Sequence, residues 1–188
     1  MEEVKVISGD TEDEIWQAVE ADFANGEVFN YEAIIREGDT PVELYMDIDL
    51  GGGFESGAEI TTLKAPLRLH SDFKFSVNDQ GAMDSIGKFF GMQDVEVGYP
   101  VLDHHLVIKT NNKDKVRQIF TDANLRQLFT SLSGFDCSIH NCKAGDSDAE
   151  QTFLELNINE GINEPKPLRK VYHGFHTLVN AIHEVDKP

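Results

Sequence analysis

The sequence predicts an α+β fold, with a largely antiparallel sheet and with N-terminal, central and C-terminal helices packed on one face. Three observations support this prediction. Segments in which apolar and polar residues alternate form a block in the first half of the chain, and such alternation is typical of antiparallel strands with one buried and one solvated face. Segments with helical periodicity lie towards both ends. A chain of 188 residues that is 40% apolar can bury the core of one domain, residues 1–188.

The first helix follows Asp10 and Thr11, and either residue can cap it. Residues 12–14 are acidic and stand favourably at the positive end of the helix dipole. Apolar residues then recur at helical spacing as far as Phe23, and Asn25-Gly26 is a stop signal. We therefore expect a short amphipathic helix that packs by one face.

Alternation predicts the strands, and helical spacing predicts three more helices. The expected strands are Tyr31 to Arg36, Val42 to Leu50, Phe54 to Leu63, Leu67 to Val77, Leu102 to Thr110, Cys137 to Asn141 and Thr152 to Asn159. The expected helices are Gly81 to Phe90, Lys113 to Leu132 with a split at Thr121-Asp122, and about Leu168 to Val185. The last helix carries an apolar stripe that is expected to dock on the buried face of the sheet.

The charge of the chain narrows the class of partner. Thirty-four acidic and sixteen basic residues give a formal charge of −18. Nucleic acids bind clustered Lys and Arg, so no nucleic acid is expected as a partner. A protein partner, particularly a basic one, or a small ligand fits better, because charge of one sign steers the opposite sign. The alternative interpretation is that the acidic charge only keeps the protein soluble.

The sequence also indicates a compartment. No run of about 18 apolar residues is present, so no membrane span is expected. The start of the sequence is acidic and does not resemble a secretory signal. Cys137 and Cys142 are too few for a secreted disulfide framework. We therefore expect a cytoplasmic protein, and no pattern in the sequence implies a cofactor.

The first candidate site is the cluster Asp103-His104-His105. In a strand from Leu102 to Thr110, adjacent side chains point to opposite faces, so the two histidines cannot bind one metal together. Asp103 and His105 would share a face, where the carboxylate could orient the imidazole. His104 would lie on the apolar face as a core-edge residue, and His105 would be solvated. We treat the three residues as a candidate binding site.

The second candidate is Cys137, His140 and Cys142, three zinc-ligand types within six residues. Their spacing is not that of a zinc knuckle, and the chain has no second cysteine pair. We expect structural cysteines in a strand and keep the three residues as a metal-site hypothesis. His173, His176 and His183 on the last helix are expected to be solvated. No nucleophile elbow, zincin or kinase pattern occurs.

Residues Gly91 to Asp103, with the apolar segment Leu106 to Asn111 that follows, resemble a segment of a family of uncharacterised bacterial proteins. Its members commonly show a Gly-Asp-Pro-x-Phe-Asp run, then an apolar strand, then a helix with Val-Arg and Leu-Arg elements. Here those elements are Val116-Arg117 and Leu125-Arg126.

The resemblance covers about Glu43 to Leu132. This chain has Tyr99 and Leu102 where the family commonly has an acid and a Phe. Many relatives look membrane-associated. The resemblance implies an α+β module without an established activity, and it transfers no catalytic residue.

Three hypotheses about function follow. The leading one is a noncatalytic bacterial domain that binds a protein or a small ligand through the polar sheet face or the loop from Gly98 to His105. The second is a metal-assisted hydrolase that uses Asp103 and His105. The third is a structural subunit, such as a homodimer that forms through an exposed sheet edge.

Overall fold

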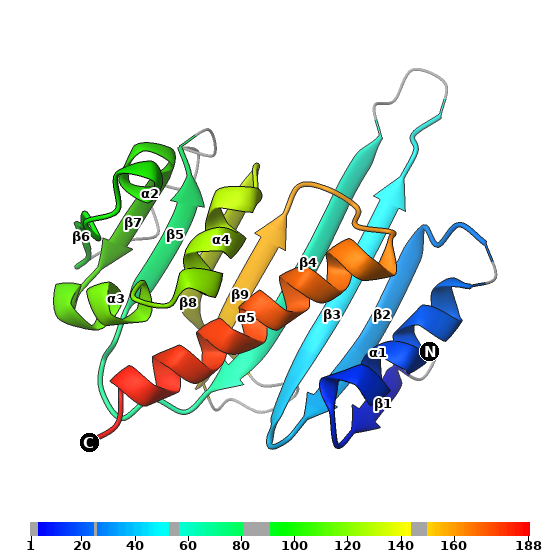
Figure 1. The fold of residues 1–188 in the computed structure, drawn as a ribbon, viewed down its shortest axis with the longest axis horizontal. Helices are drawn as coiled ribbons and strands as arrows, with labels where there is room; N and C mark the ends of the chain where they lie inside the picture. The colour runs from blue at the N-terminus through cyan, green and yellow to red at the C-terminus, as the bar shows by residue number, and fades with distance from the viewer. Residues whose placement is uncertain (1–3, 25, 53–56, 81–90, 144–149) are drawn as a thin grey trace.

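A computed structural model of the chain describes all residues except 1–3, 25, 53–56, 81–90 and 144–149. In the described part, nine strands form one sheet in the order β1-β2-β3-β4-β9-β8-β5-β7-β6. The helices lie on one face of this sheet (Figure 1). The strands are β1 (Lys5–Gly9), β2 (Asn30–Glu37), β3 (Thr40–Asp49), β4 (Ala58–Leu67), β5 (Phe75–Asp79), β6 (Gln93–Asp94), β7 (Leu106–Thr110), β8 (Phe135–Lys143) and β9 (Glu150–Ile158). The helices are α1 (Glu12–Phe23), α2 (Pro100–His105), α3 (Lys113–Ile119), α4 (Ala123–Ser131) and α5 (Pro165–Val185).

The prediction of an α+β fold with a largely antiparallel sheet is confirmed. One pair in the described sheet differs, because β1 runs parallel to β2. A parallel pair needs a crossover, and α1 supplies it between these two strands. The sequence analysis did not predict β1 or the two-residue strand β6.

The buried face of the sheet can be followed in register across seven strands. The residues of one row are all apolar, and none is more than 3% exposed. They are Ala33, Leu44, Leu63, Leu156, Cys137, Val77 and Ile108. This row marks the face that the helices cover.

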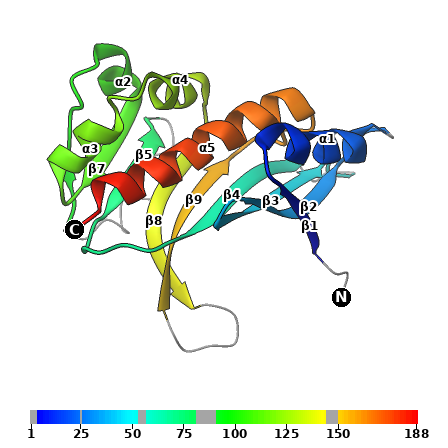
Figure 2. The ribbon, with the colours of Figure 1, turned by 60° about the horizontal axis from the view of Figure 1, so that its bottom comes forward.

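Helix α5 covers the centre of that face. It is 21 residues long, which corresponds to roughly 30 Å at 1.5 Å per residue, and it lies across several strands (Figure 2). Its buried residues include four of the five residues of the predicted stripe, Val171, Phe175, Leu178 and Ile182, and the fifth, Val185, is partly buried. The helix therefore joins the two halves of the sheet into one core.

The predicted strand from Leu67 to Val77 is wrong. β4 ends at Leu67 and β5 begins at Phe75, and β9 and β8 lie between these two strands in the sheet. Residues 68–74 form the connection. The alternation of apolar and polar residues continues through this connection because Phe73 is buried and Leu69 is partly buried. No strand of the described sheet pairs with residues 68–74, so they do not form a strand.

The strand predicted to begin at Leu102 is also wrong in its first half. Residues 100–105 form helix α2, and β7 begins at Leu106. Pro100 occupies the first turn of α2, where its fixed φ and missing N–H favour a helix start. The predicted split of the central helix is confirmed: Asn112 caps α3 and Asp122 caps α4. The predicted helix from Gly81 to Phe90 lies outside the described residues.

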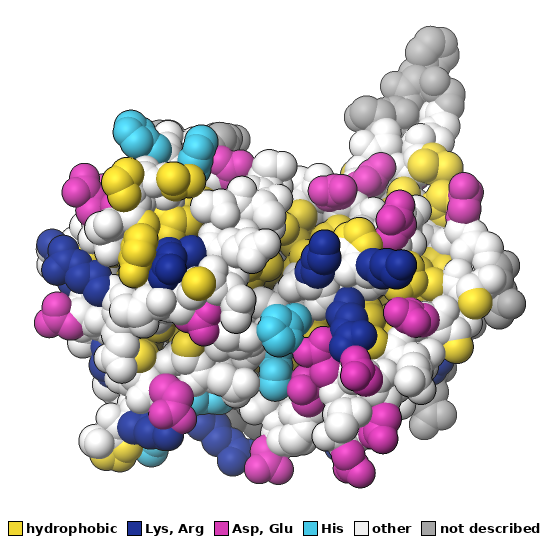
Figure 3. All heavy atoms as spheres, viewed as in Figure 1, with side chains coloured by type: hydrophobic (Ala, Val, Ile, Leu, Met, Phe, Trp, Pro, Cys, Tyr) yellow, Lys and Arg dark blue, Asp and Glu magenta, His cyan; other side chains and the backbone are white. Residues whose placement is uncertain are grey.

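The helix-covered face is unevenly charged. Lys and Arg side chains gather over the N-terminal half of α5, beside exposed hydrophobic side chains (Figure 3). Among the described residues, no helix combines the length and the apolar character needed to cross a membrane.

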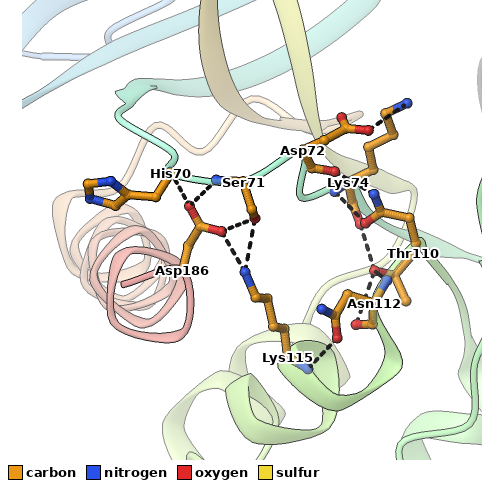
Figure 4. Close-up of polar contacts among 9 residues, drawn as sticks. His70, Ser71, Asp72, Lys74, Thr110, Asn112, Lys115 and Asp186 are labelled. Atoms are coloured by element: carbon orange, nitrogen blue, oxygen red, sulfur yellow. Dashed lines mark hydrogen bonds and ion pairs between the residues drawn. The ribbon is translucent and has the colours of Figure 1, made fainter. Parts of the chain in front are cut away.

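A polar network around the buried carboxylate of Asp186 holds the connection between β4 and β5 (Figure 4). Asp186, which is 2% exposed, accepts hydrogen bonds from the backbone N–H groups of His70 and Ser71 and from the Ser71 hydroxyl. The ammonium of Lys115 on α3 donates to Asp186 Oδ1 at 2.6 Å and to Ser71 Oγ at 3.0 Å. The network therefore ties α5, α3 and the connection together.

The same contacts set the protonation state of Asp186. Burial alone would raise the pKa of this carboxyl, but the hydrogen bonds from Lys115, from Ser71 and from the backbone outweigh it and lower the pKa from 3.8 to about 2. A carboxyl with a lowered pKa stabilises the fold above its unfolded pKa, and this stabilisation is lost as the pH falls through the folded value. For Asp186 the loss falls between about pH 4 and pH 2, and it amounts to about 2 kcal/mol.

The substitution Asp186→Asn is expected to lower the free energy of unfolding at pH 7 by about 2–4 kcal/mol, because it leaves the mostly buried Lys115 ammonium without its counter-charge. Urea unfolding at several pH values measures this. The difference between wild type and variant should shrink as the pH falls from 5 to 2. Asp72→Asn is the control, since that side chain is 83% exposed and the change should cost less than about 0.5 kcal/mol. A variant that is equally destabilised at pH 2 would contradict this account.

Candidate ligand-binding site between α1, α4 and α5

Asp103 closes a loop rather than facing a ligand. Its Oδ1 accepts a hydrogen bond from the Val97 N–H at 2.8 Å, and its Oδ2 accepts one from the Gly98 N–H at 3.0 Å. Gly98 has a φ of +88°, which only glycine adopts without strain. Both carboxylate oxygens are thus engaged in holding the turn that precedes α2.

The two neighbouring histidines do not join Asp103 in a site. Because residues 100–105 are helical, the expected separation of His104 and His105 across a strand does not occur. Both side chains are exposed, so the expectation that His104 lies at the edge of the core is wrong. A cavity of about 490 Å³ borders Asp103, and its other lining residues include Asp94, Glu96, Lys113 and Arg117 but neither histidine.

Cys137, His140 and Cys142 lie on one strand but not on one face. Cys137 belongs to the buried row of the sheet, whereas His140 and Cys142 are three and five residues later and point to the opposite face. His140 stacks on Phe153 and lies 3.5 Å from Glu155. Among the described residues, no group of three His, Cys, Asp or Glu side chains could hold a metal ion.

The histidines of α5 are held separately, and only His173 is exposed. His173 Nδ1 lies 2.7 Å from Glu12 Oε2. His176 stacks on Tyr172, and His183 Nε2 accepts the Arg68 backbone N–H at 3.4 Å. Burial, with a contribution from Arg68, lowers the pKa of His183. The expectation that all three histidines are solvated is therefore wrong for two of them.

A more promising site is a cavity of about 640 Å³ between α1, α4 and α5, which we call the helix pocket. Its floor is apolar and comprises Leu128, Val171 and Gly174. The side chains of Leu128 and Val171 are buried, so the floor belongs to the core. Exposed amides from α4, Asn124 and Gln127, line one wall.

Basic side chains line the opposite wall of the helix pocket. Lys166, Arg169, Lys170 and His173 follow one another at spacings of three, one and three residues on α5, so they share one face of the helix. Arg169 donates from Nε to Glu12 Oε1 at 2.8 Å and from a terminal nitrogen to Asp13. Burial alone would raise the pKa of Glu12, but hydrogen bonds from Arg169 and His173 outweigh it and lower that pKa.

Lys166 and Lys170 are different. Both side chains are exposed, and within the described part of the chain neither has a carboxylate within ion-pair distance. They are therefore the available cations of the pocket. Glu20 on α1 adds one exposed negative charge to the lining.

The backbone at the start of α5 offers the pocket few donors. Pro165 and Pro167 have no N–H, and the Leu168 N–H already donates to the Glu164 carbonyl at 3.1 Å. An anion at this end of the helix would therefore depend on the lysine side chains rather than on free backbone N–H groups. Sequence analysis missed this site, although the spacing of Lys166 and Lys170 beside the apolar stripe was a usable signal.

Comparisons with known proteins add little to this geometry. No family model matches the chain, and no curated protein matches it. Among solved structures, the chain is similar to the crystal structure of the mycobacterial trehalose monomycolate transport factor A, TtfA. The identity is 9% and the TM-score is 0.44, over 80% of this chain and 77% of that chain. No functional conclusion follows from a likeness at this level, and the resemblance to uncharacterised bacterial proteins stays a prediction.

The floor of the helix pocket depends on close packing at Gly174. A Cβ atom at this position would lie 2.7 Å from Leu128 Cδ2. We expect Gly174→Ala to lower the free energy of unfolding by about 1–3 kcal/mol, because either the packed Leu128 side chain must leave its position or α4 and α5 must move apart. In the double variant Gly174→Ala/Leu128→Ala the added methyl has room, so thermal unfolding should show a smaller loss than the sum of the single variants. Additive losses would contradict this explanation.

The two cysteines should differ in reactivity. Cys137 is fully buried and burial raises the pKa of its thiol, whereas Cys142 is partly exposed. Titration of the native protein with an aromatic disulfide reagent should modify Cys142 alone, and Cys137 should react only after unfolding. Cys142→Ser should abolish the native reaction. Rapid modification of Cys137 in the folded protein would contradict the register of β8.

Proposed function

We propose that this protein is a noncatalytic binding protein and that the helix pocket holds a small organic anion with an apolar part. The observation that carries the proposal is that Lys166 and Lys170, which have no ion-pair partner among the described residues, stand beside a buried apolar floor. Charged groups recognise an anion, and the floor offers surface for an alkyl or ring portion.

The chemistry of the described residues supports binding rather than catalysis. The Cys137 thiol is buried with a raised pKa, so it is a poor nucleophile. The oxygens of Asp103 are engaged by backbone N–H groups, which leaves the hypothesis of a hydrolase based on Asp103 and His105 without support. The Ser71 hydroxyl donates to Asp186 and accepts a hydrogen bond from Lys115, so its polar contacts serve to hold the connection between β4 and β5.

The electrostatics of the pocket also support an anionic ligand. The chain carries a charge of −18, so most of its surface repels anions. Three of its sixteen Lys and Arg residues stand within the five positions from Lys166 to Lys170. Arg169 is neutralised by Glu12 and Asp13 and acts to fix α5 against α1. The two lysines therefore provide a local positive region on a negative molecule.

The proposal is tested with decyl phosphate, used below the concentration at which it forms micelles, and with inorganic phosphate. Isothermal titration should show that decyl phosphate binds and that Lys166→Gln/Lys170→Gln weakens it by at least about tenfold, since each lysine supplies a charge-assisted hydrogen bond. Glu20→Gln should strengthen binding, because it removes the negative charge from the lining.

The matched control is Lys74→Gln/Lys113→Gln, which changes the net charge by the same amount at one partly exposed and one exposed position outside the pocket lining. Its affinity should stay within twofold of wild type. Equal weakening in both double variants would mean that only net charge matters and would overturn the proposal. Equal affinity for inorganic phosphate and decyl phosphate would overturn the role of the apolar floor.

A further inference from the structure

A second surface lies on the sheet face opposite the helices, and it shares no lining residue with the helix pocket. Helices of the described chain cover one side of the sheet only, as the turned view shows (Figure 2). On the other side, over β2 and β3, four side chains form a block. Glu32 lies opposite Tyr45, and Ile34 lies opposite Glu43. We call this block the strand groove, because these residues and Val4 line a cavity of about 380 Å³.

The pairing register fixes the geometry of the groove. The two carboxylates, Glu32 and Glu43, stand at diagonal positions of neighbouring strands, where Cα atoms are about 7–8 Å apart. Tyr45 and Ile34 occupy the other diagonal. Two negative groups thus bracket an aromatic ring and an aliphatic side chain.

Both carboxylates are available. Glu32 and Glu43 are exposed, and neither has an ion-pair partner within the described residues. Lys64 stands opposite Glu43 in the β3–β4 ladder. Its ammonium, however, lies over the Phe153 ring, 4.4 Å from the centroid. The ammonium of Lys64 is therefore directed towards Phe153.

Exposed apolar surface gathers at the same place. Val6, which is opposite Ile34 on β1, is 51% exposed, and Tyr45 is 37% exposed. These are two of the six large hydrophobic side chains that are exposed in the described part of the chain. Desolvation, with contributions from Asp47 and Glu32, raises the pKa of Tyr45, which is consistent with a negative local potential.

We propose that the strand groove is a docking site for a basic segment of a partner protein, with an arginine or lysine side chain between Glu32 and Glu43. The carboxylates would pair with its charged head, the Tyr45 ring offers a cation–π contact, and Ile34 and Val6 pack against its aliphatic stem. Charge complementarity points to a basic occupant, because the molecule carries −18 and this face presents two acids, without ion-pair partners in the described part of the chain, beside apolar surface.

A divalent cation fits the groove less well. Hard cations prefer six to eight oxygen ligands at short distance, whereas here two carboxylates stand at diagonal positions with a ring and an aliphatic chain between them. A basic side chain uses all four residues of the block. The proposal is independent of the helix pocket, since it concerns the opposite side of the sheet and ligands of opposite charge.

The test uses a fluorescein-labelled peptide, Gly-Ala-Arg-Ala-Arg-Ala-Gly, and the same peptide with citrulline in place of arginine. Fluorescence anisotropy at physiological salt should show binding of the arginine peptide, at least about tenfold weaker binding of the citrulline peptide, and a loss of at least about tenfold for Glu32→Gln/Glu43→Gln. Tyr45→Ala should weaken binding by about threefold or more, because it removes the ring.

The matched control is Glu160→Gln/Glu164→Gln, which makes the same charge change at exposed positions between β9 and α5. It should bind the arginine peptide within twofold of wild type, and all variants should retain the wild-type melting temperature. An equal loss in both double variants would show general charge attraction and would overturn the proposal. The proposal would also be overturned if the wild-type protein did not bind the arginine peptide. The same holds if calcium displaced the peptide from the wild-type protein at concentrations that do not displace it from the control variant.

Discussion

Burial of one face of a wide sheet by α5 is the constraint on which the rest of the structure depends. The strands around the middle of the sheet come from both halves of the chain, with β9 and β8 inserted between β4 and β5. A single long helix that lies across them removes Phe175, Leu178 and Ile182 from water together with the strand residues beneath. Because apolar burial is the dominant favourable contribution to folding, the helix and the sheet stabilise each other.

Features that depend on neighbouring residues could be predicted from the sequence. The caps at Thr11, Asn112 and Asp122 are local signals, and each accepts a hydrogen bond from a backbone N–H of the helix that it precedes. The alternation in β3 also defined a face correctly. Features that depend on distant residues could not be predicted in this way. β1 is a short strand that pairs in parallel, and the connection at 68–74 looked like a strand because Phe73 is buried.

The candidate sites show the same division. The Asp103-His104-His105 cluster drew attention because its residues are adjacent in the sequence, yet helix α2 and the loop contacts of Asp103 give it a structural explanation. The helix pocket is assembled from Glu12, Leu128 and Lys170. Glu12 and Leu128 are more than a hundred residues apart in the sequence, and β8 and β9 lie between Leu128 and Lys170. The strand groove depends on register, and register is a property of paired strands that a single alternating segment does not reveal.

The network at Asp186 also has a consequence for the order of folding. Asp186 is separated from Ser71 by 115 residues and from Lys115 by 71. Contacts with such long separations are slow to form, because the entropy of closing the loop must be overcome before they stabilise anything. During synthesis, the connection from 68 to 74 emerges well before the carboxylate that holds it. Until then, β5 is placed by its pairing with β7 and β8 and by the hydrogen bonds of Thr110 and Asn111 to residues 72 and 74. The closing of this network thus adds a late restraint on the connection between β4 and β5.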